Sequence, residues 1–406
     1  PLTRAMSPAS HDAVLILAGV TCGALVTYFL QRRKDNRVAA PPDATSKSIH
    51  VVGDVYLDMI AKVSSLPRWD ADTLIELPIE THPGGSALNT AVQLGSLINT
   101  RRRERDVSMQ RMRFDKCVLH SLVGDDVYGK LVTERIHETG VILSARSVGG
   151  QGVCICLSGP DNRAFVSYRG TVARLCERDL NKDILVHDHT GHVHFAAYFD
   201  CTGLQPCLPS LMQELKSKGA TISLVPQSDV SDEWKTDLLD LLHLVDVLIA
   251  SEEEVTMMTH VDRHDVDAAI DVLLNKRCKL VVVTMGKEGA IAVSRTERWE
   301  QPTKQRTVKD TTGAGDAFAA GFLYGWCQAG NVREGLIYGC ACGAAAVGQM
   351  GGSHPLPPDE INACMLPVTP AFMTPADYGG IVRGRGRTMP VMPVALLPSS
   401  APSATS

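Results

Sequence analysis

The chain has 406 residues, which is enough for one large domain or two of medium size. Its hydrophobic content of 44% and charged content of 21% are ordinary for a folded enzyme. The net charge of −5 gives no broad electrostatic reason to expect a nucleic-acid partner. Because the 12 cysteines include no Cys-x-x-Cys pair, we expect reduced thiols in a cytosol-like compartment.

The first predicted segment covers residues 1–37 and contains an uncharged, mostly apolar run over residues 13–30. As a helix this run would be about 27 Å long, enough to cross a hydrocarbon core. Basic residues are concentrated after the run, at Arg32, Arg33, Lys34 and Arg37. This asymmetry predicts a single-pass membrane anchor with the rest of the chain facing the cytosol. An organelle-targeting segment, or a buried helix in a cytoplasmic protein, is the alternative. Residues 38–47, with two adjacent prolines, are predicted to be a linker.

Residues 48–357 show short apolar runs that alternate with amphipathic stretches. Buried parallel strands are expected at 49–53, 117–123, 193–197, 221–225, 245–250 and 280–284. Helices are expected between them, for example at 128–139, 205–218 and 265–276. The alternation predicts an α/β domain with a three-layer, doubly wound, mostly parallel sheet. Ligands of such domains bind beyond the carboxyl ends of the strands.

Two segments interrupt this alternation, at about 59–81 and 152–168. Both have the composition of antiparallel hairpins, with turn residues between apolar stretches. Residues 358–406 are different again, since they are rich in proline and serine and have no hydrophobic period. We expect this tail to be disordered.

Glycine-rich motifs precede helices at two places far apart in the chain. The first is Pro83-Gly84-Gly85-Ser86, followed by a helix expected to reach about Leu97. The second runs from Asp310 to Phe318 and opens an apolar helix. The first N–H groups of a helix lack intrahelical partners and lie at the positive end of its dipole. A glycine loop at this position is therefore typical of a phosphate site.

Asp316 lies inside the second motif, although a carboxylate repels a bound phosphate. The conflict disappears if Asp316 takes a proton from a hydroxyl that attacks this phosphate. The motif therefore predicts phosphoryl transfer to an alcohol, with a capped glycine turn as the simpler structural interpretation.

Both motifs closely resemble the two defining motifs of the ribokinase-like (PfkB) carbohydrate kinases, and the resemblance extends from about Ile49 to Leu356. It implies an ATP-dependent kinase that phosphorylates a hydroxyl group of a small sugar or sugar-like substrate. It also implies that the two hairpin segments form a small β-sheet lid, which in many relatives makes a homodimer contact. Asp316 matches the catalytic base of the family, and the residues that match its anion hole are Gly313, Ala314 and Gly315.

The resemblance also implies residues that bind the two substrates. Asp58 matches the family's acceptor of sugar hydroxyls. Gly84 and Gly85 would let the backbone approach the sugar. Asn89 would hydrogen-bond the sugar or, alternatively, its own backbone. Two residues expected near the adenine are Thr284 and Gly286.

Metal sites follow from the same resemblance. Glu254 matches the acidic residue that orients magnesium through water, but Ser251 replaces the usual asparagine three positions before it. Asp310 and Thr312 match positions that bind a monovalent cation in many relatives, which makes potassium a candidate cofactor beside ATP and magnesium.

The acceptor remains open, because Tyr56 replaces a small polar residue that is common in pentose kinases. A nucleoside kinase is one alternative. Another is a membrane-tethered binding protein of the same fold that has lost turnover. A cluster of histidines, His187, His189, His192 and His194, lacks the flanking Cys or Glu of a zinc site.

Overall fold

The computed structural model describes residues 47–104, 113–159, 163–234 and 237–366. The predicted anchor over residues 13–30 and most of the predicted tail lie outside these ranges. None of the helices in the described ranges combines the length and apolar character that crossing a bilayer requires.

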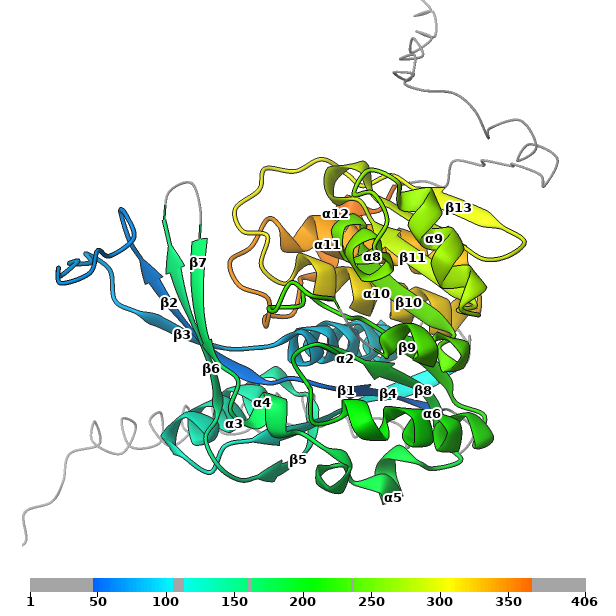
Figure 1. Cartoon of the computed structure of the whole chain (residues 1–406), viewed down its shortest axis with the longest axis horizontal. Coiled ribbons are helices and arrows are strands. Elements are labelled where there is room, and N and C mark those ends of the chain that lie inside the picture. Colours follow the sequence, from blue (N-terminus) through cyan, green and yellow to red (C-terminus); the bar gives the residue numbers. More distant parts are fainter. Residues whose placement is uncertain (1–46, 105–112, 160–162, 235–236, 367–406) are drawn as a thin grey trace, which may run out of the picture. The chain divides into compact units, whose positions relative to one another are not determined.

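A nine-stranded sheet forms the centre of the described domain, in the order β13-β12-β11-β10-β9-β8-β1-β4-β5 (Figure 1). The strands from β11 to β5 in this order are parallel to one another. They are β1 (Lys47–Val52), β4 (Phe114–Val123), β5 (Ile142–Ser147), β8 (Thr190–Phe195), β9 (Thr221–Leu224), β10 (Val247–Ser251) and β11 (Leu280–Thr284). The sheet ends in two antiparallel strands, β12 (Ala290–Val293) and β13 (Arg298–Gln301).

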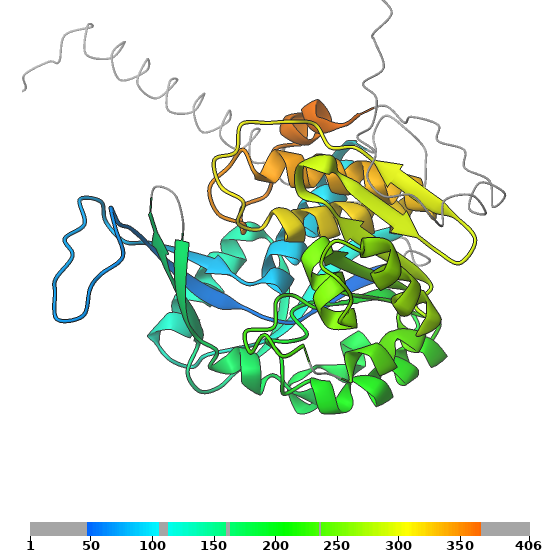
Figure 2. The same ribbon diagram turned by 45° about the horizontal axis from the view of Figure 1, so that its top comes forward.

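Helices cover both faces of this sheet (Figures 1 and 2). The larger helices of one face are α6 (Leu208–Ser217), α8 (Glu252–Thr259) and α9 (Val266–Asn275). Those of the other face are α2 (Ser86–Glu104), α10 (Ala314–Ala329) and α11 (Val332–Ala346). The remaining helices are α3 (Val127–Thr139), α4 (Thr171–Arg174), α5 (Lys182–Leu185), α7 (Leu238–Leu241) and α12 (Pro358–Cys364).

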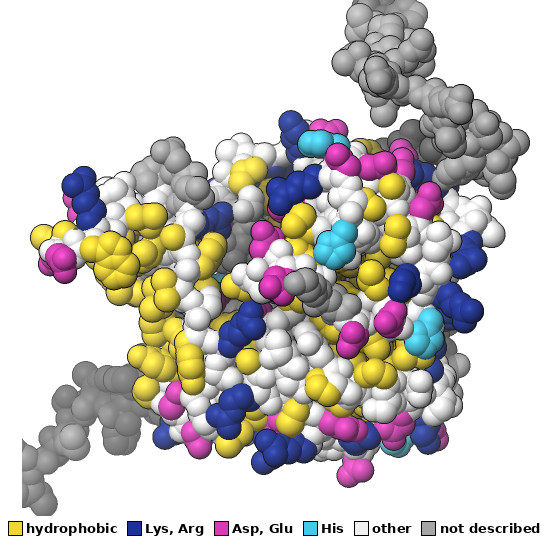
Figure 3. Space-filling view, in the orientation of Figure 1, with side chains coloured by type: hydrophobic (Ala, Val, Ile, Leu, Met, Phe, Trp, Pro, Cys, Tyr) yellow, Lys and Arg dark blue, Asp and Glu magenta, His cyan; other side chains and the backbone are white. Residues whose placement is uncertain are grey.

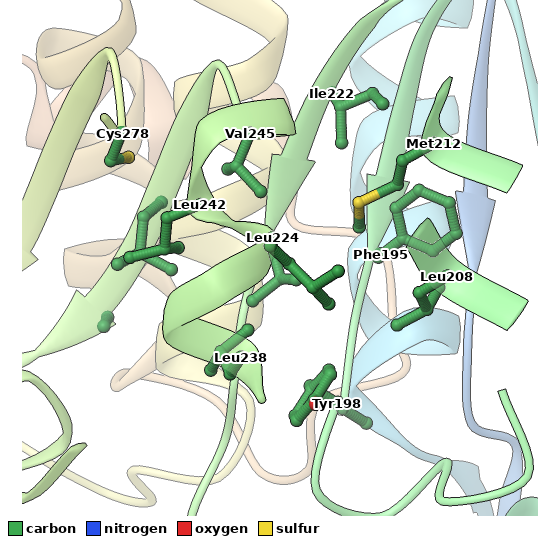
Figure 4. Close-up of a cluster of buried hydrophobic side chains, with 14 of the residues drawn as sticks. Phe195, Tyr198, Leu208, Met212, Ile222, Leu224, Leu238, Leu242, Val245 and Cys278 are labelled. Atoms are coloured by element: carbon green, nitrogen blue, oxygen red, sulfur yellow. The ribbon is translucent and has the colours of Figure 1, made fainter. Parts of the chain in front are cut away.

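Successive residues of the central strands point to opposite faces, as the pleat of a strand requires. In β11, Val281 and Val283 pack in the cluster under α6, α8 and α9, part of which Figure 4 shows around Phe195 and Met212. Val282 packs instead in the cluster with Phe318 and Phe322 of α10. Because both faces are buried, the strands read as continuous apolar runs, and the predicted doubly wound α/β class is confirmed.

A second sheet has the order β3-β2-β6-β7 and stands at the edge of the large one (Figure 1). Its strands are β2 (Tyr56–Lys62), β3 (Glu80–Gly84), β6 (Gly152–Ser158) and β7 (Arg163–Tyr168). We call this sheet the lid. The pairs β2–β3 and β6–β7 are antiparallel, as predicted, and β2 and β6 join the two hairpins in parallel.

Three boundaries differ from the prediction. Helix α2 continues to Glu104 instead of ending near Leu97. The first lid strand begins at Tyr56 rather than 59, so Asp58 lies within the lid. Residues 358–364 form helix α12, so the prediction of a disordered tail over 358–406 is wrong for this part. A proline in the first turn starts α12, and its Ile361 and Cys364 are buried against the core.

Candidate active site

The carboxylate of Asp316 lies in the first turn of α10, where two side chains from α2 hold it. The hydroxyl of Ser86 donates to its Oδ1 at 2.7 Å, and Nδ2 of Asn89 donates to its Oδ2 at 2.8 Å. Burial raises the pKa of Asp316, while these two hydrogen bonds oppose the rise. The arrangement provides a carboxylate with a fixed orientation and an increased basicity.

Asn89 was expected to bind the sugar or its own backbone, and the structure shows that it binds Asp316. Its Oδ1 is buried and has no hydrogen-bond partner among the described residues. Buried polar atoms nearly always have a partner, so an unpaired acceptor beside the base is a place for a ligand hydroxyl.

The loop before α10 is glycine-rich because the space around it is limited on one side. Gly313 has a left-handed φ of 74°, and a Cβ on it would lie 2.5 Å from Cα of Gly352. Ala314 begins the helix. At Gly315, in contrast, a Cβ would meet no atom within 4 Å. The helix start therefore borders open space at Gly315, which suits an anion, while the N–H of Ala314 donates to the Thr311 carbonyl at 3.2 Å.

Asp58 lies on lid strand β2, and Gly84 on β3 leaves room for it, since a Cβ at Gly84 would overlap the Asp58 carboxylate. Burial raises the pKa of Asp58 to about 7, and the negative charge of Asp316 adds to the rise. The two carboxylates are thus close enough to interact electrostatically, although Asp58 lies on a lid strand and Asp316 on helix α10.

Asp54, which the sequence analysis missed, holds the start of α2. Its carboxylate accepts from the backbone N–H groups of Ser86 at 2.9 Å and Ala87 at 2.8 Å. Burial raises its pKa to about 7, against the hydrogen bond from Ala87 and with help from the charges of Asp200 and Asp316. Gly85 has a φ of +105°, and a Cβ on it would lie 2.8 Å from the Asp54 carbonyl oxygen. The position of Asp54 just after the buried strand β1 could have identified it as a candidate site residue.

Gly84 and Gly85 have a second role in the structure, because they make room for Asp58 and Asp54. That they also let the backbone approach a sugar stays a prediction. Without side chains at these positions, two carboxylates can lie beside the backbone that leads into α2.

A cavity of about 310 Å³ borders residues 313–315, which we call the anion loop. It is bounded by Thr284 and Gly286, by Ala314 and Gly315, and by the small residues Gly343 and Ala344 of α11. Its size is at the lower end of the range for small-molecule pockets. The structure thus brings the two residues predicted near adenine to the same cavity as the anion loop, so the residues present fit a nucleotide.

Glu254 and Ser251 form a capping box at the start of α8. Oε2 of Glu254 accepts from the Ser251 N–H at 2.7 Å, and the Ser251 hydroxyl accepts from the Glu254 N–H at 3.2 Å. Burial raises the pKa of Glu254 despite these bonds, and the charge of Asp316 contributes. Serine in place of asparagine therefore still caps the helix, and Glu254 lies near enough to Asp316 for the charge of Asp316 to raise its pKa.

Asp310 and Thr312, the residues predicted for a monovalent cation, bind an arginine that the sequence analysis missed. Nη1 of Arg163 contacts the Asp310 carboxylate at 2.8 Å and the Thr312 hydroxyl, and its Nη2 donates to Thr311 at 2.9 Å. No local pattern could reveal this contact, since Arg163 is 147 positions from Asp310.

Within the described ranges, no group of three or more His, Cys, Asp or Glu side chains is arranged so that it could hold a metal ion. Two of the clustered histidines bind hydroxyls, since His192 bonds Thr221 and Ser223 at 2.8 Å and His194 bonds Ser223 at 2.7 Å. A magnesium ion would therefore take most of its ligands from a nucleotide and water.

The sequence model of the pfkB family carbohydrate kinases matches residues 46–359. The chain belongs to this family. It is 28% identical to the ATP-dependent ribose-1-phosphate kinase of Halopiger xanaduensis over 77% of this chain and 95% of that protein. It is 26% identical to the probable fructokinase-5 of Arabidopsis thaliana over 82% of this chain and 97% of the relative.

Solved structures agree on the fold. The ribokinase of Arabidopsis thaliana complexed with ribose and ATP matches with a TM-score of 0.65 and 19% identity, over 78% of this chain and 98% of that one. A putative ribokinase II of E. coli, in complex with ATP and magnesium, matches with a TM-score of 0.65 and 22% identity over the same shares. The predicted ribokinase-like architecture and carbohydrate kinase class are thus confirmed.

Proposed function

We propose that this carbohydrate kinase transfers the terminal phosphoryl group of ATP to a hydroxyl of a small sugar-like acceptor, with Asp316 as general base. The observation that carries the proposal is the place of the Asp316 carboxylate. It lies in the first turn of α10, directly after the anion loop, and Asn89, whose Nδ2 donates to it, has an unpaired Oδ1.

Each of the site residues has a separate role in the proposed reaction. Asp58 accepts hydrogen bonds from acceptor hydroxyls, and Asn89 Oδ1 accepts another. Asp316 takes the proton of the attacking hydroxyl as its oxygen forms the new bond to phosphorus and the bond to the ADP oxygen breaks. The N–H groups of Gly313, Ala314 and Gly315 stabilise the negative charge on the transferred group without reorganising. ATP supplies the phosphoryl group.

For the metals, we propose that Glu254 orients magnesium through water, as its burial beside the Asp316 charge supports. Potassium is a further proposal at Asp310 and Thr312. Because Arg163 occupies their side chains, a cation there would be held by backbone carbonyls. Activity measured in potassium and in choline salts at equal ionic strength tests this.

The test of the main proposal is to incubate the full chain with Mg-ATP and a panel of ketoses, aldoses, sugar phosphates, amino sugars and nucleosides. ADP release and the phosphorylated product are both measured, with Asp316→Asn as the matched variant. Product formation that depends on Asp316 supports the proposal. Transfer to nucleosides alone favours the nucleoside-kinase alternative. Binding of a sugar without turnover favours a member that has lost activity.

The lid supports a proposal about assembly. Large apolar side chains gather on it, as Figure 3 shows for one face of the molecule. Trp69 and Leu74, in the connection between β2 and β3, are 98% and 88% exposed, and Val166 and Tyr168, which share the face of β7 opposite to that of Asp58, are 62% and 61% exposed. Such a surface marks an interaction site, and we propose that a second copy of the chain covers it. Light scattering of the protein and of Val166→Ser tests this, because only the former should dimerise.

We also propose, from the sequence alone, that residues 13–30 anchor the chain in a membrane. Alkaline extraction of membranes from cells that express the full chain tests it. Recovery in an organelle lumen or in the cytoplasmic fraction would favour the two alternatives.

A further inference from the structure

Arg163 connects the lid to residues 310–312, which precede α10 and which we call the phosphate loop. It is the first residue of β7, at the far end of the β6–β7 hairpin. Its two terminal nitrogens bond three consecutive residues of the loop before α10, namely Asp310, Thr311 and Thr312. A planar guanidinium presents its donors in a fixed fork, so this contact sets the direction as well as the distance of the loop.

Asp310 is buried, and Arg163 is not its only partner. Its side chain is only 8% exposed, and its carboxylate also accepts from the backbone N–H of Gly351 at 2.9 Å and of Thr312 at 2.9 Å. Burial is outweighed by these hydrogen bonds and by the charge of Arg163, so the pKa of Asp310 is lowered. One ionised carboxylate therefore ties together the lid, the phosphate loop and the loop that carries Gly352 against Asn89.

The lid carries Asp58 on the same sheet as Arg163. Arg163 pairs with Ser158 of β6, and Asp58 on β2 pairs with Cys154 of the same strand. A hydrogen-bonded sheet transmits the position of one strand to the next. Fastening the lid at Arg163 therefore also determines how far Asp58 stands from Asp316.

We propose that Arg163 is a positioning residue that locks the lid to the phosphate loop, so that closure over the acceptor and ordering of the anion hole occur together. This inference rests on the proposed function. Arg163 touches neither reacting group; it acts through Asp310 and the two threonines.

The test compares Arg163→Met and Arg163→Lys with Lys62→Met. Lys62 pairs with Glu80 on the exposed part of the lid and does not contact the loop, which makes it a matched control. Misplacing reacting groups by about 1 Å can cost about 100-fold in rate. We expect Arg163→Met to lower kcat for the acceptor about 10- to 100-fold with little change in KM for ATP. Arg163→Lys keeps the charge but loses the fork, so it should restore only part of the rate.

Hydrogen exchange of the same variants, without substrates, provides a readout that needs no activity. The amides of residues 152–158 and 310–316 should exchange faster together in Arg163→Met and remain as in the wild type in Lys62→Met. Faster exchange in the hairpin alone would overturn the proposal, and so would kinetics equal to those of Lys62→Met. A raised KM for ATP with an unchanged kcat would make Arg163 a nucleotide ligand and would also overturn it. If the wild type phosphorylates no acceptor, the proposed function fails, while the exchange data still decide the role of Arg163.

Discussion

The hydroxyl of Ser86 donates a hydrogen bond of 2.7 Å to Oδ1 of Asp316, although the two residues lie 230 positions apart. Ser86 begins α2 and Asp316 lies in the first turn of α10, so the bond joins the N-termini of two helices. The two glycine motifs therefore belong to one site.

Replacing Asp316 by Asn should lower kcat by about 10²–10⁴-fold, the usual effect of losing a general base. The affinity for ATP should change little, because the amide keeps the size of the side chain and the helix start is intact. Steady-state kinetics and nucleotide titration measure both. Asp271→Asn on the exposed side of α9 is the control, and turnover of Asp316→Asn close to that of this control would remove Asp316 from the mechanism.

Replacing Ser86 by Ala should move the acid limb of the kcat profile to higher pH. The bond from Ser86 lowers the pKa of Asp316, so its loss raises this pKa further and leaves less ionised base at a given acidic pH. Thr90→Val is a matched control, since the Thr90 hydroxyl contacts only the backbone carbonyl of Asp316, at 3.4 Å. An equal shift in both variants would contradict the assignment.

A Cβ at position 84 would overlap the Asp58 carboxylate. We therefore expect Gly84→Ala to displace Asp58 and raise KM for the acceptor, with KM for ATP unchanged. Gly95→Ala on α2 is the control, because its added methyl group meets only Cys117 Cβ, at 4.0 Å. Acceptor saturation curves that coincide for the two variants would show that Asp58 does not bind the acceptor.

The acceptor kcat/KM should fall as the pH drops through about 7, the raised pKa of Asp58. Asp58 accepts charge-assisted hydrogen bonds from hydroxyl groups only when ionised, so if binding needs these bonds the decline well below its pKa approaches about tenfold per pH unit. Asp54 has a pKa raised to a similar value, so the variant Asp58→Asn assigns the limb. Persistence of the same limb in Asp58→Asn would attribute it to another group.

His194 is buried in the central sheet, and burial lowers its pKa from 6.5 to about 3. Between these values the unfolded chain binds a proton that the folded chain does not, so His194 reduces stability as the pH falls below 6.5. In His194→Asn the slope of unfolding free energy against pH should flatten by about 1.4 kcal/mol per unit in this window. Denaturant titrations from pH 7 to 4 measure it, and a slope in His194→Asn equal to that of the wild type would contradict this prediction.

Measuring a difference between variants matters here, because other groups act in the opposite direction. The raised pKa values of Asp54 and Asp58 make the folded chain bind more protons than the unfolded chain between about 4 and 7. Their contribution is present in both variants and cancels.

The sequence allowed the central strands to be predicted, because buried parallel strands are continuous apolar runs such as Leu280–Thr284. It was less informative where tertiary packing decides. The end of α2 is polar and has no hydrophobic period, so its extension to Glu104 could not be seen. Helix α12 has only a few turns, and two buried residues, Ile361 and Cys364, hold it in place.

The candidate site shows the same division. Asp316 and the anion loop could be predicted from a local motif, because a few glycines before a helix are typical of an anion site. The contacts of Ser86, Asn89 and Arg163 depend on segments brought together by the fold. Side-chain hydrogen bonds over such separations leave no periodic signal in the chain.

Asp58 and Asp316 lie on separate parts of the fold, Asp58 on a lid strand and Asp316 on a helix that packs against the large sheet. A molecule that engages both carboxylates is held at two points, whereas a water bound at one of them is held at one point only. We therefore expect the enzyme to spare its nucleotide when no sugar is bound.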